Sequence, residues 1–327
     1  MEISTIVHWN YLIALLLGFA TLPLLILLIV TQTTLTFKPY SKMLLPCAVA
    51  DLLFMTVDAI GQIKARLEDG VFLCALEGPG RNLSRSNQIL LTVLSVAGFC
   101  FVQSSIPVQA YFRFHALKRG STLSILQTTG LFSLSIVGIV PLTVLMYTAF
   151  NTSELLRPEF DYSSLWYKND TPTVLLVADI RSPYQKLYFL YCAIFITSVY
   201  LIAFYYGTQT LATLHDKSRV VSTKTKRIQS QLSMYLFCQG LIPLLTAVGP
   251  TLGLVLGQFF NLNLGSLAAL CVLCYSWIPF LNGLLTIVVI APYRNAVCRW
   301  IKKPKSRTHS LTTSSSGNGT RSSFSRY

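Results

Sequence analysis

The stretch that decides the fold is residues 43–63, MLLPCAVADLLFMTVDAIGQI, an apolar run that contains two carboxylates, Asp51 and Asp58. As a helix with ~1.5 Å of rise per residue it is about 31 Å long, which matches the hydrocarbon thickness of one bilayer. An ionised aspartate at the centre of a lone spanning helix costs roughly 2.5–3.5 kcal/mol on insertion scales, so neither acid is expected to face lipid. The two acids lie two helical turns apart and share one face, which is predicted to point into a bundle of other helices.

The composition of the whole chain agrees with a membrane bundle. Hydrophobic residues make up 53% and charged residues 12% of the 327 residues, and the mean hydropathy is +0.56. These values exclude a soluble protein and predict a polytopic membrane protein. Runs long enough to cross a bilayer lie at residues 11–35, 43–63, 88–112, 123–149, 184–211, 230–257 and 264–291. The predicted fold is therefore an all-α bundle of seven transmembrane helices.

The distribution of lysine and arginine predicts how the bundle is oriented. Residues 36–42, 113–122, 212–229 and 292–327 share one side of the membrane and carry 18 of the 26 basic residues. The positive-inside rule places that side in the cytoplasm, so the N-terminus is predicted outside the cell. The formal net charge of +14 then reflects the orientation of the chain in the membrane, and no nucleic acid partner is expected.

The segments outside the predicted bundle are short. Residues 1–10 form the outer N-terminal segment, and the bundle occupies residues 11–291. Residues 292–305 place apolar side chains beside basic ones, which predicts an amphipathic helix at the membrane interface. Residues 306–327 are rich in Ser and Thr and are expected to be disordered.

Cysteines give little support for a disulfide. Of the eight cysteines, Cys74 alone lies in a predicted outer loop, so a bridge between outer loops lacks a second partner and a free or buried thiol is expected. Cys298 lies beside the membrane in the amphipathic segment. It could carry an acyl chain or remain unmodified.

Catalysis is not expected from this sequence. The four histidines lie outside the predicted membrane core, so a metal site within the bundle would lack imidazole ligands, and no metal or cofactor is predicted. Asp51 and Asp58 are about 10 Å apart by helix rise, which is too far for a carboxylate pair that shares a proton. No phosphate-binding loop or nucleophile elbow is present. Signal transfer and transport therefore remain as the candidate functions.

Two candidate sites follow from the depth of the polar residues. Asp51 lies about 12 Å into the membrane, at a depth where Asn282 of the seventh span could meet it in a polar core. Asp58 lies nearer the outer end, where a pocket for a small molecule would open. The other predicted wall residues of this pocket are Asn87, Ser95, Tyr191, Tyr275 and Trp277.

The sixth span is the predicted moving part. Pro243 and Pro250 each free a backbone carbonyl, which permits a bend; a static irregularity is the alternative. Arg113 ends the third span and is either a cation that snorkels to the interface or a buried switch, and the sequence alone favours the first. The basic residues Lys224, Lys226 and Arg227 would contact a partner protein or anionic lipid.

Three stretches carry a resemblance to a known family. Residues 231–243, QLSMYLFCQGLIP, resemble the helix 6 signature of nematode serpentine chemoreceptors of the Str-type group, which are seven-span G-protein-coupled receptors. The motif residues there are Gln231 and Gln239. Pro292, Tyr293 and Arg294 are similar to the family's terminal Pro-Tyr-Arg, and residues 112–114 are similar to its Tyr-Arg-Tyr. Class delta is the most similar subfamily, followed by classes h and str.

The resemblance implies a receptor in the plasma membrane of a sensory neuron, often on a cilium, that detects small environmental chemicals through a heterotrimeric G protein. It also favours the switch role of Arg113. The chain departs from rhodopsin-like receptors in several places: no acid precedes Arg113, no Trp precedes Pro243, and helix 7 lacks Asn-Pro-x-x-Tyr. The rhodopsin-type locks therefore cannot be transferred to it.

Two other functions are compatible with seven spans. A transporter would place paired charges at mid-membrane on broken helices and often shows inverted repeats, and no repeat is visible here. An odorant-gated channel of the inverted type would have its N-terminus inside, which the basic residues contradict.

The orientation can be tested by glycosylation. Sequons at Asn82, Asn151 and Asn169 lie on the predicted outer side, and Asn318 lies in the predicted cytoplasmic tail. We expect glycans on the first three, because only outer loops meet the glycosylation machinery. Mobility of single Asn→Gln variants with and without glycosidase measures this. A glycan on Asn318, or an epitope at residue 1 that antibodies cannot reach on intact cells, would contradict the orientation.

Overall fold

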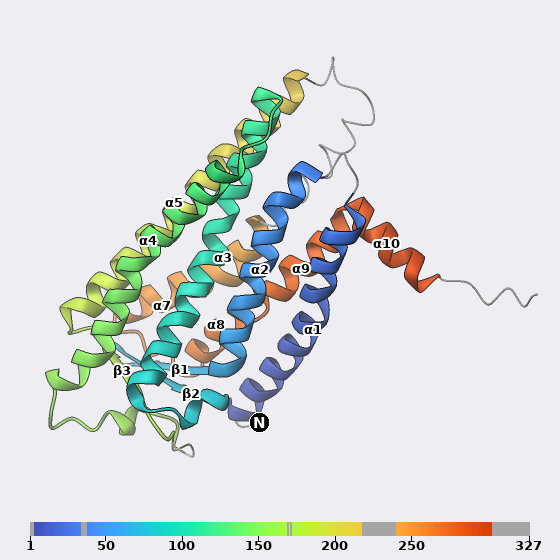
Figure 1. Ribbon diagram of the computed structural model, residues 1–327. Coiled ribbons are helices and arrows are strands. Elements are labelled where there is room, and N and C mark those ends of the chain that lie inside the picture. The colour runs from blue at the N-terminus through green and yellow to red at the C-terminus, as the bar shows by residue number, and fades with distance from the viewer. Residues whose placement is uncertain (1–2, 34–37, 169, 171, 218–239, 303–327) are drawn as a thin grey trace, which may run out of the picture.

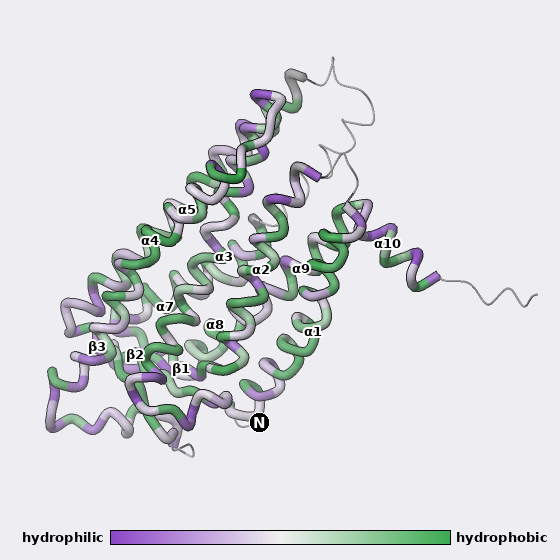
Figure 2. The backbone as a smooth tube through the Cα atoms, viewed as in Figure 1, coloured by the Kyte–Doolittle hydropathy of each residue, from purple (hydrophilic) through white to green (hydrophobic). Residues whose placement is uncertain are grey.

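The computed structural model describes residues 3–33, 38–168, 170, 172–217 and 240–302. Long helices lie side by side in one bundle, and a small sheet covers the end of the bundle at which the N-terminus lies (Figure 1). Hydrophobic residues run along the helices, whereas hydrophilic residues concentrate in the loops and on α10 (Figure 2). We call the sheet, together with the segment 153–182 that packs on it, the lid.

Six described helices are long and apolar enough to span a membrane, and a bent helix pair supplies the seventh span. The helices are α1 (Ile3–Gln32), α2 (Lys38–Gly61), α3 (Arg85–Arg119), α4 (Ile125–Thr152), α5 (Pro183–Lys217) and the span Gly240–Phe259, which includes α7 (Gly249–Phe259). The pair α8 (Leu267–Tyr275) and α9 (Ile278–Val289) bends by 41°. The predicted seven-helix bundle is confirmed.

Local sequence sets where these helices begin and end. Ser124 starts α4 with a capping box, in which its Oγ accepts from the Gln127 backbone amide at 3.2 Å and the Gln127 side chain accepts in return at 3.0 Å. Gly120 ends α3 with a left-handed φ of 70°, a conformation that glycine adopts without strain. Helix α3 packs against α2, α4 and α5, so it forms the centre of the bundle.

The sixth span contains a π-helical turn, η4 (Leu244–Val248), which directly precedes α7. Pro243 caps this turn and Pro250 lies in the first turn of α7, so the two prolines flank it. A proline removes a backbone donor, and the wider π turn absorbs the resulting mismatch in the hydrogen-bond ladder. The irregularity that the two prolines predict in the sixth span is therefore this π-helical turn.

The lid sheet was not predicted from the sequence. Its antiparallel order is β1 (Ile63–Glu68), β2 (Val71–Leu76) and β3 (Leu176–Asp179). Strands β1 and β2 form a hairpin with a two-residue turn, Asp69-Gly70, whose φ angles of 49° and 69° are both positive. This combination is typical of the type I′ turn, which Asp-Gly favours. The second predicted span thus ends as a helix at Gly61, and the chain continues as a strand.

The sheet has two buried faces. Its inner face, which includes Ala65, Cys74 and Leu176, joins the hydrophobic core of the bundle. Its outer face, which includes Leu73 and Val177, packs under aromatic residues of the segment 153–182. Burial raises the pKa of the Cys74 thiol above its usual range, so the thiol stays neutral. Cys74 is free, as expected from the sequence.

Lys64 is fully buried on the outer face of the sheet. Its ammonium lies 3.0 Å from Glu77 and 2.6 Å from Asp170, and it contacts the Ser4 hydroxyl at the start of α1. The same ammonium lies 4.9 Å from the centroid of the Tyr167 ring. These contacts compensate a charge that would otherwise be costly to bury, and they join α1 to the lid.

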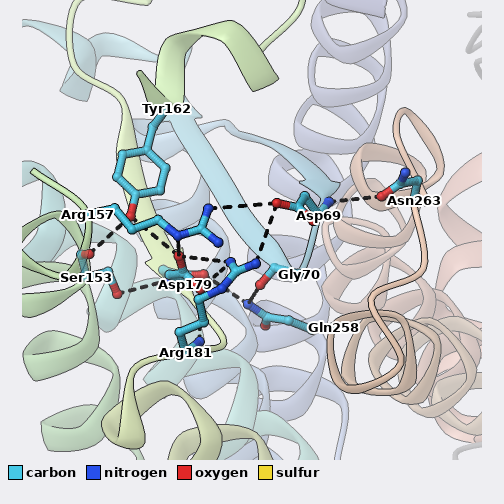
Figure 3. A network of polar contacts seen from close by, with 10 residues as sticks. Asp69, Gly70, Ser153, Arg157, Tyr162, Asp179, Arg181, Gln258 and Asn263 are labelled. Atoms are coloured by element: carbon cyan, nitrogen blue, oxygen red, sulfur yellow. Dashed lines mark hydrogen bonds and ion pairs between the residues drawn. The ribbon is translucent and has the colours of Figure 1, made fainter. Parts of the chain in front are cut away.

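A second polar network, centred on the fully buried Asp179, joins three loops (Figure 3). The Asp179 carboxylate lies 3.2 Å from Arg181 and 3.9 Å from Arg157, and its backbone amide donates to the Ser153 hydroxyl at 3.0 Å. Gln258, at the end of the sixth span, donates to the carbonyls of Gly70 and Ala178, each at 2.9 Å. The lid is thereby tied to the helix that contains the π turn.

Asp179→Ala is expected to loosen the lid. The substitution leaves Arg157 and Arg181 with only the exposed Asp69 as an ion-pair partner among the described residues. It also removes an acceptor of the buried Tyr162 hydroxyl, and the two losses together cost roughly 1–3 kcal/mol of the free energy of unfolding. The thermal unfolding midpoint of the detergent-purified protein measures the loss. Glu159→Ala is the matched control, because Glu159 is an exposed acid in the same segment. Equal midpoints for the two variants would show that the network does not stabilise the lid.

Candidate ligand-binding site

A cavity of about 90 Å³ lies in the bundle directly beneath the sheet. The residues that line it come from α2, α3, α4, α5, α7 and α8, and the inner face of the sheet forms its roof. A third of the lining residues are aromatic: Phe54, Phe72, Phe99, Phe150, Tyr188, Phe189 and Tyr275. A mostly apolar wall with a few polar groups is typical of sites for small molecules.

The polar groups of the cavity differ in whether they have partners. The hydroxyls of Thr251 and Tyr275 are hydrogen-bonded to each other at 2.9 Å, which joins α7 to α8. Gln185 donates to Gln258 at 3.0 Å, so this wall of the cavity is connected to the lid. Asp58, in the last turn of α2, is 6% exposed, and its Oδ2 accepts no hydrogen bond from any described residue.

The structure places some predicted wall residues at the cavity and others elsewhere. Asp58, Ser95 and Tyr275 line it. Asn87 is exposed. Tyr191 donates to the Gly138 carbonyl at 2.7 Å, and Trp277 donates to the Asn10 side chain at 2.9 Å. Asn87, Tyr191 and Trp277 do not line the cavity, because their side chains point elsewhere.

Sequence reasoning also missed residues that do line the cavity, including Phe99, Gln185 and Thr251. Phe99 lies four residues after Ser95 on α3, so the helical spacing of one predicted residue would have found it. Thr251 directly follows Pro250. Gln185 lies in the first turn of α5, and its alignment with the cavity depends on how α5 packs.

The predicted polar core is present below the cavity. The Asn282 side-chain amide of α9 donates to Asp51 Oδ1 of α2 at 3.1 Å, and both residues are buried. Thr286, one turn further along α9, donates to the Asn282 carbonyl at 2.7 Å. The pair links the second and seventh spans inside the bundle.

Arg113 lies near the end of α3 that is distant from the lid, and it is 4% exposed. A snorkelling arginine keeps its guanidinium in water, so the burial of Arg113 favours the switch interpretation, which stays a prediction. Lys224, Lys226, Arg227, Gln231 and Gln239 lie outside the described residues. Their predicted roles stay predictions.

Residues 8–298 match the family model "Serpentine type 7TM GPCR chemoreceptor Str". The chain belongs to this family of chemoreceptors. The family consists of seven-transmembrane G-protein-coupled receptors and not of enzymes, as expected from the sequence. Pro292, Tyr293 and Arg294, which carried part of the resemblance, begin α10 (Ala291–Ile301).

The receptor also resembles individual proteins. It is 30% identical over 102 residues to "Serpentine receptor class r-10" of Caenorhabditis elegans, covering 31% of this chain and 30% of that protein. It is 30% identical over 119 residues to the protein of the same name in Caenorhabditis briggsae, covering 36% and 34%. The matched segments thus span about a third of these curated relatives. The crystal structure of squid rhodopsin superimposes with a TM-score of 0.67 at 10% identity, over 92% of this chain and 87% of that chain, and shows the shared fold.

The family motif at α10 has a structural role. Tyr293 is fully buried, and its hydroxyl is hydrogen-bonded to the Thr33 hydroxyl at 3.1 Å, which fixes the start of α10 against the end of α1. Arg294 donates to the Val288 carbonyl at 2.9 Å and thereby caps the end of α9. Cys298 on α10 is exposed, so a thiol there is accessible for acylation.

Asp51→Ala is expected to abolish signalling by the receptor while its surface level persists. The substitution removes the acceptor that joins α2 to α9, so a movement of one span is no longer transmitted to the other. The measurement pairs surface labelling with G-protein activation by an active ligand. Asn282→Ala should reproduce the loss because it removes the donor of the same bond. Normal signalling in both variants would show that the buried acid is merely tolerated.

Proposed function

We propose that the receptor binds a small environmental chemical in the cavity beneath the lid and activates a heterotrimeric G protein on the opposite side of the membrane. The observation that carries this proposal is the Thr251–Tyr275 hydrogen bond of 2.9 Å in the cavity wall. Thr251 lies directly after the π turn and its flanking prolines. A ligand that shifts Tyr275 would therefore act on the helix that is best suited to bend.

The lid faces the outside of the cell in this proposal. The positive-inside rule supports it, since the predicted cytoplasmic side carries most basic residues. Asn82 and Asn151 are exposed at the lid end, and Asn169 and Asn318 lie outside the described residues. We place the receptor in the plasma membrane of a sensory neuron, on its cilium, and in class delta, with classes h and str as alternatives. The motif residues support the Str-type group as a whole, and the matched relatives carry the class r name.

Coupling would use a change in the sixth span. A π turn and an α turn differ by one residue in hydrogen-bond register, so the segment between Pro243 and Pro250 can take two discrete arrangements. Swinging the cytoplasmic end of this span would open a cleft beside the buried Arg113, while the outer half keeps its contact with the ligand. Lys224, Lys226 and Arg227 would meet the G protein or the anionic lipid around it.

Arg113→Ala is expected to remove G-protein activation while ligand binding and surface level persist. The buried guanidinium is the charge that the opened cleft would present to the partner. A ligand screen with a G-protein readout supplies an active compound, and ligand-stimulated nucleotide exchange on a co-expressed G protein is then measured. Arg119→Ala is the matched control, because Arg119 is exposed near the end of the same helix.

The triple variant Lys224/Lys226/Arg227→Ala separates protein contact from lipid attraction. Lipid attraction contributes about 1 kcal/mol for each basic residue, so it predicts a graded loss with Arg113→Ala mild. A coupling cleft predicts that Arg113→Ala alone removes exchange. Near-normal exchange in that single variant would exclude the switch role of Arg113.

A further inference from the structure

Asp58 is a buried carboxylate whose charge has no compensating group. It lines the cavity, it is 6% exposed, and no described Lys, Arg or His forms a salt bridge with it. The other buried acids differ: Asp51 accepts from Asn282, and Asp179 is surrounded by two arginines and a serine. Keeping a carboxylate charged and unpaired in an apolar setting is costly, so such a group either takes up a proton or marks a site that receives a partner.

The surroundings of Asp58 favour a cation as that partner. Among the described residues that line the cavity, Asp58 is the only charged one, so an anionic ligand would find no counter-charge. Phe54 lies one helical turn before Asp58 on the same face of α2. Its ring centroid is 6.3 Å from that of Phe99, which is 4.6 Å from that of Tyr275. The faces of aromatic rings attract a cation, and their bodies accommodate its apolar part.

The size of the cavity limits the ligand further. An engineered apolar cavity of roughly 150 Å³ holds one benzene molecule. The cavity here, at about 90 Å³, is smaller than that, so it admits a molecule smaller than benzene and is too small for a peptide or a lipid chain. A compact amine with one hydrocarbon group matches the volume, the charge and the aromatic lining together.

We propose that the receptor recognises small protonated amines, with the ligand ammonium donating to the Asp58 carboxylate and its hydrocarbon part lying against Phe54 and Phe99. This inference rests on the proposed role of the cavity as the ligand site. Phe99 contacts the Tyr275 ring, and the Tyr275 hydroxyl is hydrogen-bonded to Thr251 of the sixth span. An amine that lies against Phe99 is therefore connected to the sixth span through Tyr275.

The test compares ligands of one shape and different charge. Propan-2-amine, propan-2-ol, propanone and 2-methylpropanoate share one branched skeleton that is smaller than benzene, and the amine alone is cationic at neutral pH. Binding to the detergent-purified receptor is measured by the rise of its unfolding midpoint with ligand concentration, without any signalling step. We expect the amine to bind roughly tenfold to a hundredfold more tightly than the alcohol or ketone, the range for one charge-assisted hydrogen bond.

Two variants localise the effect. Asp58→Asn keeps the shape of the side chain and removes its charge, so it should abolish the preference for the amine. It also removes an unpaired buried charge, so the ligand-free protein should unfold at the same or a higher temperature. Asp51→Asn is the matched control: it alters the other acid on this helix, which does not line the cavity, and the preference for the amine should persist.

The outcomes distinguish this inference from the proposed function. If the alcohol, ketone or carboxylate binds as tightly as the amine, or if Asp58→Asn leaves the preference intact, the assignment of ligand class is wrong. A neutral compound that activates a G protein would refute the ligand class and leave the receptor function standing. Amine binding at Asp58 without nucleotide exchange would support the ligand class and contradict the proposed coupling.

Discussion

The arrangement of the bundle depends on the cost of placing carboxylates in a medium of low polarity. Helix α2 carries two acids on one face, and that face cannot be turned toward lipid. The structure handles them differently. Asp51 is held by an amide from α9, which fixes the second and seventh spans against each other. Asp58 lies at the wall of a cavity, where the bundle leaves room for a partner in place of a protein side chain. One helix face thus contains both a structural contact and the carboxylate that we propose as the recognition group.

The lid solves a second problem, which is how to cover a cavity at the end of a helical bundle. A sheet is suited to this task because its side chains alternate, so one face can continue the core of the bundle while the other accepts an outer layer. Strand β2 is central and pairs with β1 on one side and with β3, from a distant part of the chain, on the other. Carbonyls on the open edge of β1 accept from Tyr11, Tyr167 and Gly265. Buried charges on the outer side, at Lys64 and Asp179, are each matched by opposite charges.

Much of the fold could be predicted from the sequence because the bilayer imposes a length and a composition on every span. The hairpin was missed although its signal is present: Asp69-Gly70 stands between an alternating segment, residues 63–68, and a short apolar run, residues 71–76, and a search for loops in a helical protein does not test for it. Side-chain direction was the weaker inference. Asn87 is exposed and its neighbour Gln88 is fully buried, so an error of one residue turns a wall residue toward the surface. Trp277 lies at the break between α8 and α9, where a straight helix gives the wrong direction.

The way in which the lid is closed has a consequence for where and how the receptor can mature. All seven cysteines that the structure describes are free, and the roof is held by backbone hydrogen bonds, buried ion pairs and aromatic packing. Closing the lid requires no oxidant and no disulfide isomerase, so its folding is independent of the thiol balance of the compartment in which it takes place. Reducing compounds in the surroundings would likewise not open the closed lid, because no disulfide holds its described residues. Its weak point is instead ionic, since the partly exposed arginines that surround Asp179 are screened by salt.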